Sequence, residues 1–549
     1  MIFAFSLMIL VEKWNQFSQP KPSEVAANVA GTPAVPASGV PVPTQSMSGK
    51  NASASSVPAV EPHDTAAAVM ATTIKTDLFE AGFSSLGGDL VRLELLKYRS
   101  VEDKHKNLLL IDPHHQYAAQ SGLIGEGLPN HKSTFQWVQG PTELAPGSDA
   151  LKVRFVATTA GVKATKIYTF KRGSYQIDLA WEIENTGPAA IAPDAYFQLQ
   201  RDDVKPEGES RMVSTFTGPA VFTDAEKYQK ISFSDIVSDK AKYAKTANNG
   251  WLAMVQHYFV SAWVPKGNVE REFYMRDAAN QGSKHVVQAG VIVPVGQIAP
   301  GSRGTVDVDL YTGPQEQGVL KQIAPGLDLV VDYGWLTVVA APIFWLLEWI
   351  HKLVGNWGWS IVVLTLLIKA AFFPLSAASY RSMAKMRMLT PRLMALKERI
   401  GDDRQRLNQE MMKLYQSEKV NPLGGCLPVV VQIPVFISLY WVLLGAVEMR
   451  DAPWIFWIKD LSSADPFYVL PVVMVVSMFI QTKLNPTPPD PIQAKVMMIM
   501  PFAFGFMFFW FPAGLVLYWV VNNVLSIAQQ WQITRMMESG GKAANDAKA

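Results

Sequence analysis

Cysteine is almost absent from this chain of 549 residues, which contains only Cys426. A single cysteine excludes an intrachain disulfide, a Cys-x-x-Cys redox pair and a multi-cysteine zinc site. Histidine is also scarce, with eight residues and no His-Glu-x-x-His spacing. The sequence contains no Walker loop, dinucleotide fingerprint or nucleophile elbow. We therefore expect a protein that is not an enzyme, with no cofactor and no metal site.

An excess of charge of one sign is lacking too, because the net charge is only +2. This balance argues against a nucleic-acid-binding protein. Nearly half of the residues are apolar, and the apolar runs are concentrated in the last third of the chain. We expect a large water-exposed part joined to a membrane part.

The N-terminal part predicts an anchor and a linker. Residues 2–11 are apolar but fall short of the roughly 20 residues that span a bilayer. No basic residue precedes them and no small-x-small cleavage site follows, which is unlike a cleaved signal peptide. We expect a membrane anchor over residues 1–18, either short and uncleaved or shortened by a misassigned start codon. The Pro-, Ala- and Ser-rich residues 19–68 predict a disordered linker.

Residues 69–332 predict an all-β sandwich. Apolar and polar residues alternate with a period of two in several short runs, which are separated by Gly, Asn, Asp and Pro. The clearest runs are residues 151–158, 166–172, 175–184 and 305–312. None of them is long enough to cross a membrane.

The rest of the chain predicts a helical membrane domain. Residues 333–356 contain apolar positions at helical spacing interleaved with charged ones, which predicts an interfacial amphipathic helix. A membrane core over residues 357–534 follows, and residues 535–549 form a tail. We expect five spans in the core, at residues 357–375, 427–447, 467–482, 496–511 and 513–532. The third and fourth of these are short for a bilayer about 30 Å thick, which suggests local thinning.

The connection between the first two core spans fixes the orientation. Residues 376–426 contain ten Lys and Arg against five acidic residues, so this segment belongs in the cytoplasm. Alternation of the spans then places the β domain outside, in the periplasm of a bacterium, and the C-terminal tail in the cytoplasm. We expect a multi-pass protein of the bacterial inner membrane.

Lys369 is the most informative single residue, because it lies within the apolar run of residues 360–375. An ammonium near the bilayer centre costs about 2.5–3.5 kcal/mol on insertion scales. Two interpretations remain open. The side chain either extends to the cytoplasmic interface, roughly 10 Å away along the helix, or enters a water-filled cavity. Thr365 lies one helical turn before it.

The last span favours the cavity. Its polar residues recur every three or four positions and form one stripe, and the second core span adds two more polar residues. The stripe is Tyr518, Asn522, Ser526 and Gln529, and the additions are Gln432 and Tyr440. Polar groups that face lipid stay unsatisfied, so a groove shared by three spans explains the stripe and Lys369 together. Interhelical hydrogen bonding is the alternative.

Residues 377–420 predict a cytoplasmic helical hairpin. Its first helix ends near Ile400 and Gly401, and Asp402 is expected to cap the second, with Gln405 three residues on. The hairpin is rich in methionine, at positions Met383, Met386, Met388, Met394, Met411 and Met412. Flexible thioethers suit varied apolar partners, although methionine also fills ordinary helix interfaces. The basic excess suits anionic lipid headgroups or ribosomal RNA.

Three sequence blocks resemble the YidC membrane protein insertases of Gram-negative bacteria. They are SMAKMRMLTPRLMALKERIGDD, QEMMKLYQSEKVNPLGGCLPVVVQIPVFISLYWVL and WFPAGLVLYWVVNN, at residues 382–403, 409–443 and 510–523. The resemblance extends to residues 331–361 and, in the outer domain, to 117–123 and 250–265. It covers nearly everything except the linker and the tail.

The resemblance implies a five-helix insertase core around a hydrophilic groove that is open to the cytoplasm and closed to the periplasm. The family usually has arginine where this chain has Lys369, and Thr365 and Tyr518 match groove positions. It implies nascent membrane proteins as clients and the Sec translocon, the ribosome and membrane lipids as partners. It also implies a β-supersandwich similar to sugar mutarotases, from which no activity follows.

Two other functions remain as alternatives. A small-solute transporter would account for an intramembrane charge, but such proteins usually contain two related halves, which this sequence lacks. The other is a periplasmic binding or assembly module that the helices merely anchor.

Overall fold

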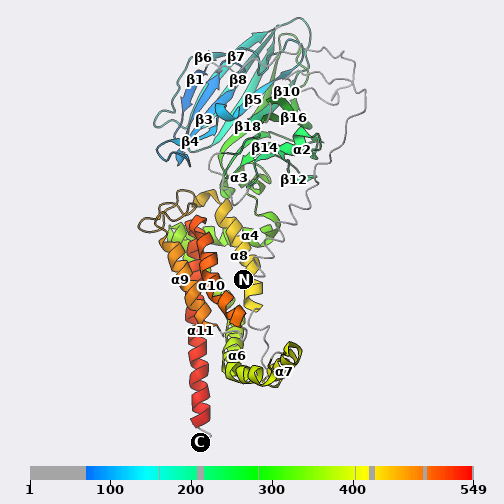
Figure 1. Cartoon of the computed structure of the whole chain (residues 1–549). Coiled ribbons are helices and arrows are strands. Elements are labelled where there is room, and N and C mark those ends of the chain that lie inside the picture. The colour runs from blue at the N-terminus through cyan, green and yellow to red at the C-terminus, as the bar shows by residue number, and fades with distance from the viewer. Residues whose placement is uncertain are drawn as a thin grey trace. The chain divides into compact units, whose positions relative to one another are not determined.

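The computed structural model describes residues 70–546, apart from residues 160, 207–214, 282–283, 402, 419–426 and 486–490. Contacts divide the chain into one unit that ends at Val331 and another that starts at Asp332, and each is described by itself (Figure 1). The anchor predicted for residues 1–18 and the linker predicted for residues 19–68 lie outside the described residues.

The first unit consists of two nine-stranded antiparallel sheets, as the period-two pattern predicts. The first sheet runs β1-β2-β3-β5-β10-β17-β16-β13, with β4 paired to β3. Its strands are β1 (Met70–Lys75), β2 (Phe79–Ser84), β3 (Leu90–Arg99), β4 (Asn107–Ile111), β5 (Ala118–Ile124), β10 (Asp194–Asp202), β13 (Thr246–Ala247), β16 (Arg271–Gln281) and β17 (Lys284–Pro294).

The second sheet runs β12-β11-β14-β15-β18-β9-β8-β7-β6. Its strands are β6 (Gln136–Val138), β7 (Ala150–Thr159), β8 (Val162–Lys171), β9 (Gln176–Asn185), β11 (Gly218–Thr223), β12 (Lys227–Lys230), β14 (Trp251–Gln256), β15 (Phe259–Pro265) and β18 (Arg303–Pro314). Strands β7, β8, β9 and β18 confirm the four runs read from the sequence. Short helices connect strands or close the unit: η1 (Pro113–His115), α2 (Phe233–Val237), α3 (Gln317–Ile323) and η2 (Leu327–Val330).

Aromatic side chains join the two sheets. Phe83 of the first sheet packs against Phe155 of the second with ring centroids 5.4 Å apart, and Phe197 packs against Trp263 at the same distance. All four are buried. Such pairs contribute about 0.5–1.5 kcal/mol each beyond their buried area, so the sandwich has a continuous aromatic core.

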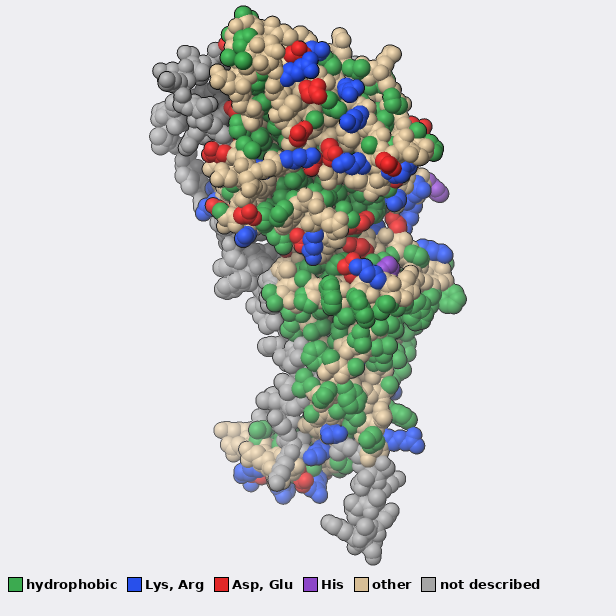
Figure 2. All heavy atoms as spheres, turned by 180° about the vertical axis from the view of Figure 1, so that it is seen from behind, with side chains coloured by type: hydrophobic (Ala, Val, Ile, Leu, Met, Phe, Trp, Pro, Cys, Tyr) green, Lys and Arg blue, Asp and Glu red, His purple; other side chains and the backbone are tan. Residues whose placement is uncertain are grey.

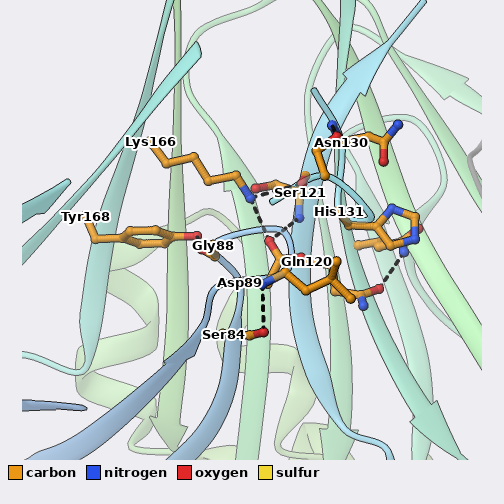
Figure 3. Close-up of polar contacts among 12 residues, drawn as sticks. Ser84, Gly88, Asp89, Gln120, Ser121, Asn130, His131, Lys166 and Tyr168 are labelled. Carbon is orange, nitrogen blue, oxygen red and sulfur yellow. Dashed lines mark hydrogen bonds and ion pairs between the residues drawn. The ribbon is translucent and has the colours of Figure 1, made fainter. Parts of the chain in front are cut away.

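A buried ion pair interrupts this apolar core (Figure 3). Lys166 of β8 extends across to the first sheet, where its Nζ lies 2.6 Å from Asp89 Oδ1 and donates to Ser121 O at 3.0 Å. Both charged side chains are almost fully buried, and the ammonium also lies about 5 Å from the rings of Phe135 and Trp181. Burying a charge without a partner strongly destabilises a fold, so each of the two charged groups offsets the cost of burying the other.

The second unit is helical. Its elements are η3 (Gly334–Leu336), α4 (Thr337–Val354), α5 (Trp357–Ala371), α6 (Phe373–Ile400), α7 (Arg404–Ser417), α8 (Leu427–Gly445), η5 (Val447–Met449), α9 (Val469–Leu484), α10 (Pro491–Met507), η6 (Phe508–Trp510) and α11 (Ala513–Asp546). Figure 2 shows a band of hydrophobic side chains on the visible face of this unit, with Lys and Arg gathered at the hairpin of α6 and α7. The band is typical of a surface that faces lipid.

The first core span is shorter than the sequence predicts. The apolar run of residues 357–375 is not one helix, because α5 ends at Ala371 and α6 starts at Phe373, with a bend of 67° between them. Pro374 explains the break, since proline has no N–H to donate to the carbonyl of Ala370. The last helix is longer than the span predicted at residues 513–532, because α11 continues to Asp546.

Helix α4 has 18 residues with a mean hydropathy of 1.4, enough by length and composition to cross a bilayer. No other single described helix meets that test, although the bent pair of α5 and α6 meets it together. Figure 1 shows α4 lying across one end of the bundle, where it packs on α5 and α8. Its Phe344, Leu347 and Ile350 face the protein, whereas Trp345 and Trp349 are exposed.

A loop at residues 446–468 connects helices at one end of the bundle through hydrogen bonds. Asn356, before α5, donates to the carbonyl of Pro453, and the N–H of Gly514 in α11 donates to Leu461 O. A side chain at Gly358 would lie 2.2 Å from Trp454, so this glycine allows the loop to pack directly on α5. The loop therefore fixes the spacing of α5 and α11.

Candidate functional site

Lys369 lies on the last turn of α5, and its side chain is directed at α11. Its Nζ donates to Ser526 Oγ at 2.8 Å, and Ser526 in turn donates to the carbonyl of Asn522, one turn earlier, at 2.7 Å. Within the described part of the chain, no carboxylate forms an ion pair with Lys369. The cation is therefore held between helices by a neutral hydroxyl, which an anion can replace.

Helix α8 completes the arrangement. Gln432 Nε2 donates to Asn522 Oδ1 at 2.6 Å, so Asn522 links α8 to α11 while Ser526 links α5 to α11. Gln432 also approaches the hydroxyl of Tyr518 without reaching hydrogen-bond geometry. The three spans that sequence analysis assigned to one groove thus contribute to one connected line of polar side chains.

Two other predicted groove residues, Thr365 and Tyr440, have partners within α5 and near the start of α11. Thr365 is buried and donates to Ile361 O of its own helix at 2.7 Å, as threonine often does inside a helix. Tyr440 packs against Phe511 with ring centroids 6.2 Å apart, near the start of α11. Tyr518 is buried, and its ring centroid lies 6.3 Å from that of Phe436 of α8.

The structure also reveals polar residues that sequence reasoning missed. Asn523 and Gln530 of α11 face away from the stripe toward α9, where Asn523 donates to Ser477 Oγ at 3.2 Å and Gln530 to Leu484 O at 3.1 Å. Tyr380 of α6 approaches Ser526 without reaching hydrogen-bond geometry. The seven-residue spacing of Asn523 and Gln530 is a second helical stripe, and that spacing was available in the sequence.

The hairpin ends and begins close to where the sequence predicts. The N–H of Gly401, whose φ is 70°, bonds to Lys397 O and terminates α6. The prediction of Asp402 as the cap of α7 is wrong, because Asp403 Oδ1 accepts from the N–H of Arg406 at 3.0 Å. The cap lies one residue later since its oxygen must reach the third residue of the helix.

The six methionines of the hairpin are distributed over both arms. Three are exposed to about half or more of their surface, and three are partly buried. The exposed ones are Met388, Met394 and Met412, and the partly buried ones are Met383, Met386 and Met411. An ion pair between Arg392 and Glu418, at 2.6 Å, holds the arms together. The hairpin thus presents flexible apolar side chains on a basic surface.

Nothing in the described residues resembles a metal centre, since no three His, Cys, Asp or Glu side chains gather in one place. The arrangement of α5, α8 and α11 can attract an anion and satisfy polar groups inside an apolar bundle.

Comparison with known proteins gives two matches to family models that together cover nearly the whole of both units. A model described as the YidC periplasmic domain matches residues 71–346, and one described as the 60Kd inner membrane protein matches residues 349–540. A solved structure described as an active YidC insertase crystal structure with the first transmembrane domain resolved is 20% identical. It covers 83% of this chain and 91% of that one, with a TM-score of only 0.39.

Curated relatives are similar over their full length. A protein of Dechloromonas aromatica, named membrane protein insertase YidC, is 68% identical, with 100% of this chain and 98% of the relative covered. A protein of Aromatoleum aromaticum with the same name is 57% identical with the same coverage. This chain therefore belongs to the YidC family of membrane protein insertases.

Proposed function

We propose that this chain inserts hydrophobic segments of newly made membrane proteins into the inner membrane and assists their folding. It is an inner-membrane protein with a periplasmic domain. The observation that carries the proposal is the polar line from Gln432 through Asn522 and Ser526 to Lys369, which three helices build inside an apolar bundle.

The ammonium of Lys369 gives the groove its attraction. Its present partner is a hydroxyl, so a carboxylate on the polar flank of a client gains a charge–charge interaction by replacing Ser526. Lysine acts here as a point charge without the planar fork of arginine, so we expect attraction of acidic flanks without bidentate capture. Tyr518 and Gln432 offer further polar contacts beside it.

The hairpin of α6 and α7 receives the client first. Its exposed methionines contact varied apolar segments, and its basic residues keep it on the cytoplasmic side. They also suit contact with the ribosome and with anionic lipid headgroups. We further propose the Sec translocon as a partner for clients that need both machines, on the basis of the family resemblance.

The apolar segment of the client then leaves the groove for lipid. Helix α10 packs mainly on α9, whereas α8 packs mainly on α4, so the space between α8 and α10 is the exit that we propose. Each buried CH₂ contributes about 0.8 kcal/mol, which supplies the direction of transfer without ATP. The groove lowers the barrier for the polar flank.

Helix α4 and the terminal segments complete the proposed organisation. We assign α4 to the membrane interface although its length would allow a span, since its exposed Trp345 and Trp349 suit the headgroup region. We propose residues 1–18 as a membrane anchor and 19–68 as a linker. Residues 535–549 are assigned to a cytoplasmic tail.

Site-specific crosslinking tests the groove. A photoreactive residue is placed at position 369 or 518, and a ribosome-stalled membrane protein is supplied as client. We expect crosslinks from both positions. A probe at Val524, which is exposed on another side of α11, is the matched control and should crosslink lipid instead. Equal client crosslinking from position 524, with none from 369, would contradict the proposed path.

A further inference from the structure

One face of the first sheet carries a polar surface that the insertion mechanism does not use. Antiparallel register places two cross-strand rows side by side on β5, β10, β17 and β16. The first row is Gln120, Gln198, Gly290 and Tyr274, and the second is Ala118, Gln200, Gln288 and Arg276. Because paired residues of antiparallel strands point to the same side, their side chains share one face.

Glycine makes room for an aromatic ring on this face. A Cβ on Gly290 would lie 2.4 Å from the Tyr274 hydroxyl, so the ring lies directly over this glycine. Tyr196 lies over Gly122 in the same way, again at 2.4 Å. Glycine weakens a strand and typically marks a close approach to the backbone. Tyr274 stays partly exposed, whereas Tyr196 is buried.

The second row contains a hydrogen-bond donor that no described residue engages. Arg276 donates from Nε and Nη2 to Gln288 Oε1 at 2.9 and 2.7 Å. A guanidinium can only donate, which fixes the orientation of the Gln288 amide. Gln288 Nε2 then donates to Gln200 Oε1 at 2.8 Å. The amide oxygen of Gln200 is thus used, and no described residue accepts from its NH₂.

The hydrogen bonds of the first row run in the same direction, from β16 toward β5. The hydroxyl of Tyr274 donates to Gln198 Oε1 at 2.6 Å, and Gln198 Nε2 donates to Gln120 Oε1 at 2.7 Å. Gln198 is fully buried, but Gln120 and Gln200 are partly exposed. Both exposed amides therefore keep NH₂ groups that are not engaged by the described residues.

Positive charge lies beside these donors. Lys132 is exposed, and it is close enough to Arg276 for the two charges to interact. The neighbouring His131 is buried, which lowers its pKa to about 3 and keeps it neutral at physiological pH. The carboxylates of this face lie at its ends, where Glu272 is two residues before Tyr274 and Asp202 is bonded to His115 at 3.2 Å. The centre is donor-rich and cationic.

We propose that this face binds a carboxylate-bearing saccharide, such as a uronate unit. A carboxylate only accepts hydrogen bonds, so it matches the two NH₂ groups that no described residue engages and the adjacent Arg276 and Lys132. Tyr274, which is partly exposed and has Arg276 at 5.8 Å from its ring centroid, provides apolar contact for a sugar ring beside these donors. An acidic peptide offers the same charge, but its backbone N–H groups find few acceptors on this surface. The proposal is independent of the insertase function.

Binding of an oligogalacturonate to the full-length protein in detergent tests the proposal by isothermal titration calorimetry. The key variant is Gln200→Glu, because its carboxylate still accepts from Gln288 while the outward donor becomes an acceptor. We expect the Kd for the saccharide to rise at least tenfold in this variant and in Gln120→Glu. Gln136→Glu, the same change at an exposed position of the second sheet, should leave the Kd unchanged.

Two comparison ligands test whether binding needs the carboxylates and whether it needs a saccharide. A neutral oligosaccharide of equal length should bind at least tenfold more weakly than the oligogalacturonate, and so should an oligoglutamate of equal charge. Absence of saccharide binding by the parent chain overturns the proposal. An unchanged Kd in Gln200→Glu does so too, and tighter binding of the oligoglutamate would assign the face to acidic peptides instead.

Discussion

Replacing Lys369 by alanine should slow the insertion of clients with an acidic translocated flank. Among the described residues, the ammonium has the Ser526 hydroxyl as its one hydrogen-bond partner, at 2.8 Å. A client carboxylate at 4 Å would gain about 4 kcal/mol at an effective dielectric constant of 20. It must first displace the bond to Ser526, which contributes about 1.5–3 kcal/mol. The net attraction is therefore about 1–2.5 kcal/mol.

This net attraction corresponds to a change in insertion rate of about 5- to 70-fold, with about tenfold as a representative value, since each 1.36 kcal/mol of barrier is a factor of ten. The assay is insertion of a single-span client into proteoliposomes with purified protein, measured by protection of the translocated flank from protease. Lys369→Arg should insert the acidic client at close to the parental rate, because it keeps the charge. Lys369→Ala should lose about tenfold.

A client with a neutral flank provides the matched control, because its insertion does not depend on charge attraction. Its rate should change less than threefold in Lys369→Ala. The reasoning is refuted if Lys369→Ala inserts the acidic client as fast as the parent chain. It is also refuted if both clients slow equally, since that result would indicate a structural role for the lysine.

Three further predictions concern stability. Asn523→Leu removes the hydrogen bond to Ser477 and should lower the free energy of unfolding in detergent by about 0.6–1.7 kcal/mol. If the losses of Asn523→Leu and Ser477→Ala simply add in the double variant, the two residues are not coupled and the prediction is contradicted. Lys166→Met leaves Asp89 buried without its partner and should cost about 3–5 kcal/mol in chemical denaturation, whereas adding Asp89→Leu should restore most of the loss. His131 has a folded pKa of about 3 against 6.5 when unfolded, so its contribution is complete above pH 6.5 and declines as the pH falls toward 3. Tryptophan fluorescence should therefore show about 2 kcal/mol less stability at pH 5 than at pH 7, and His131→Gln should remove that difference; an equal pH dependence in the variant would show that another group is responsible.

The repeating patterns of the sequence predicted most of the architecture. Alternation with a period of two identified strands such as β7 and β8, because each has one face toward the core. Helical spacing placed Asn522 and Ser526 on one face of α11, because residues three or four apart are neighbours on a helix. The bend at Phe372 was missed because hydropathy continues through it, although Pro374 marked it.

Long-range pairing was beyond the reach of these patterns. Nothing in the sequence connects Lys166 with Asp89, which lie 77 positions apart, or the Gln120 row with Tyr274. The sequence predicted which polar residues form the groove, but it did not predict which of them are hydrogen-bonded to one another. Thr365 bonds within its own helix and Tyr440 packs on Phe511, contacts that the spacing of polar residues did not predict.

The sequence by itself determined which polar residues lie in apolar segments. They are a lysine in an apolar run and the polar side chains of the last helix, which packs in an apolar bundle. The sequence could do so because burial and periodicity are local properties of the chain. The tertiary structure decided how these polar groups are paired, with Ser526 as the partner of Lys369 and Asn522 as the partner of Gln432. A hydrogen bond depends on the relative position of two helices, and only the packing of the whole bundle sets that position.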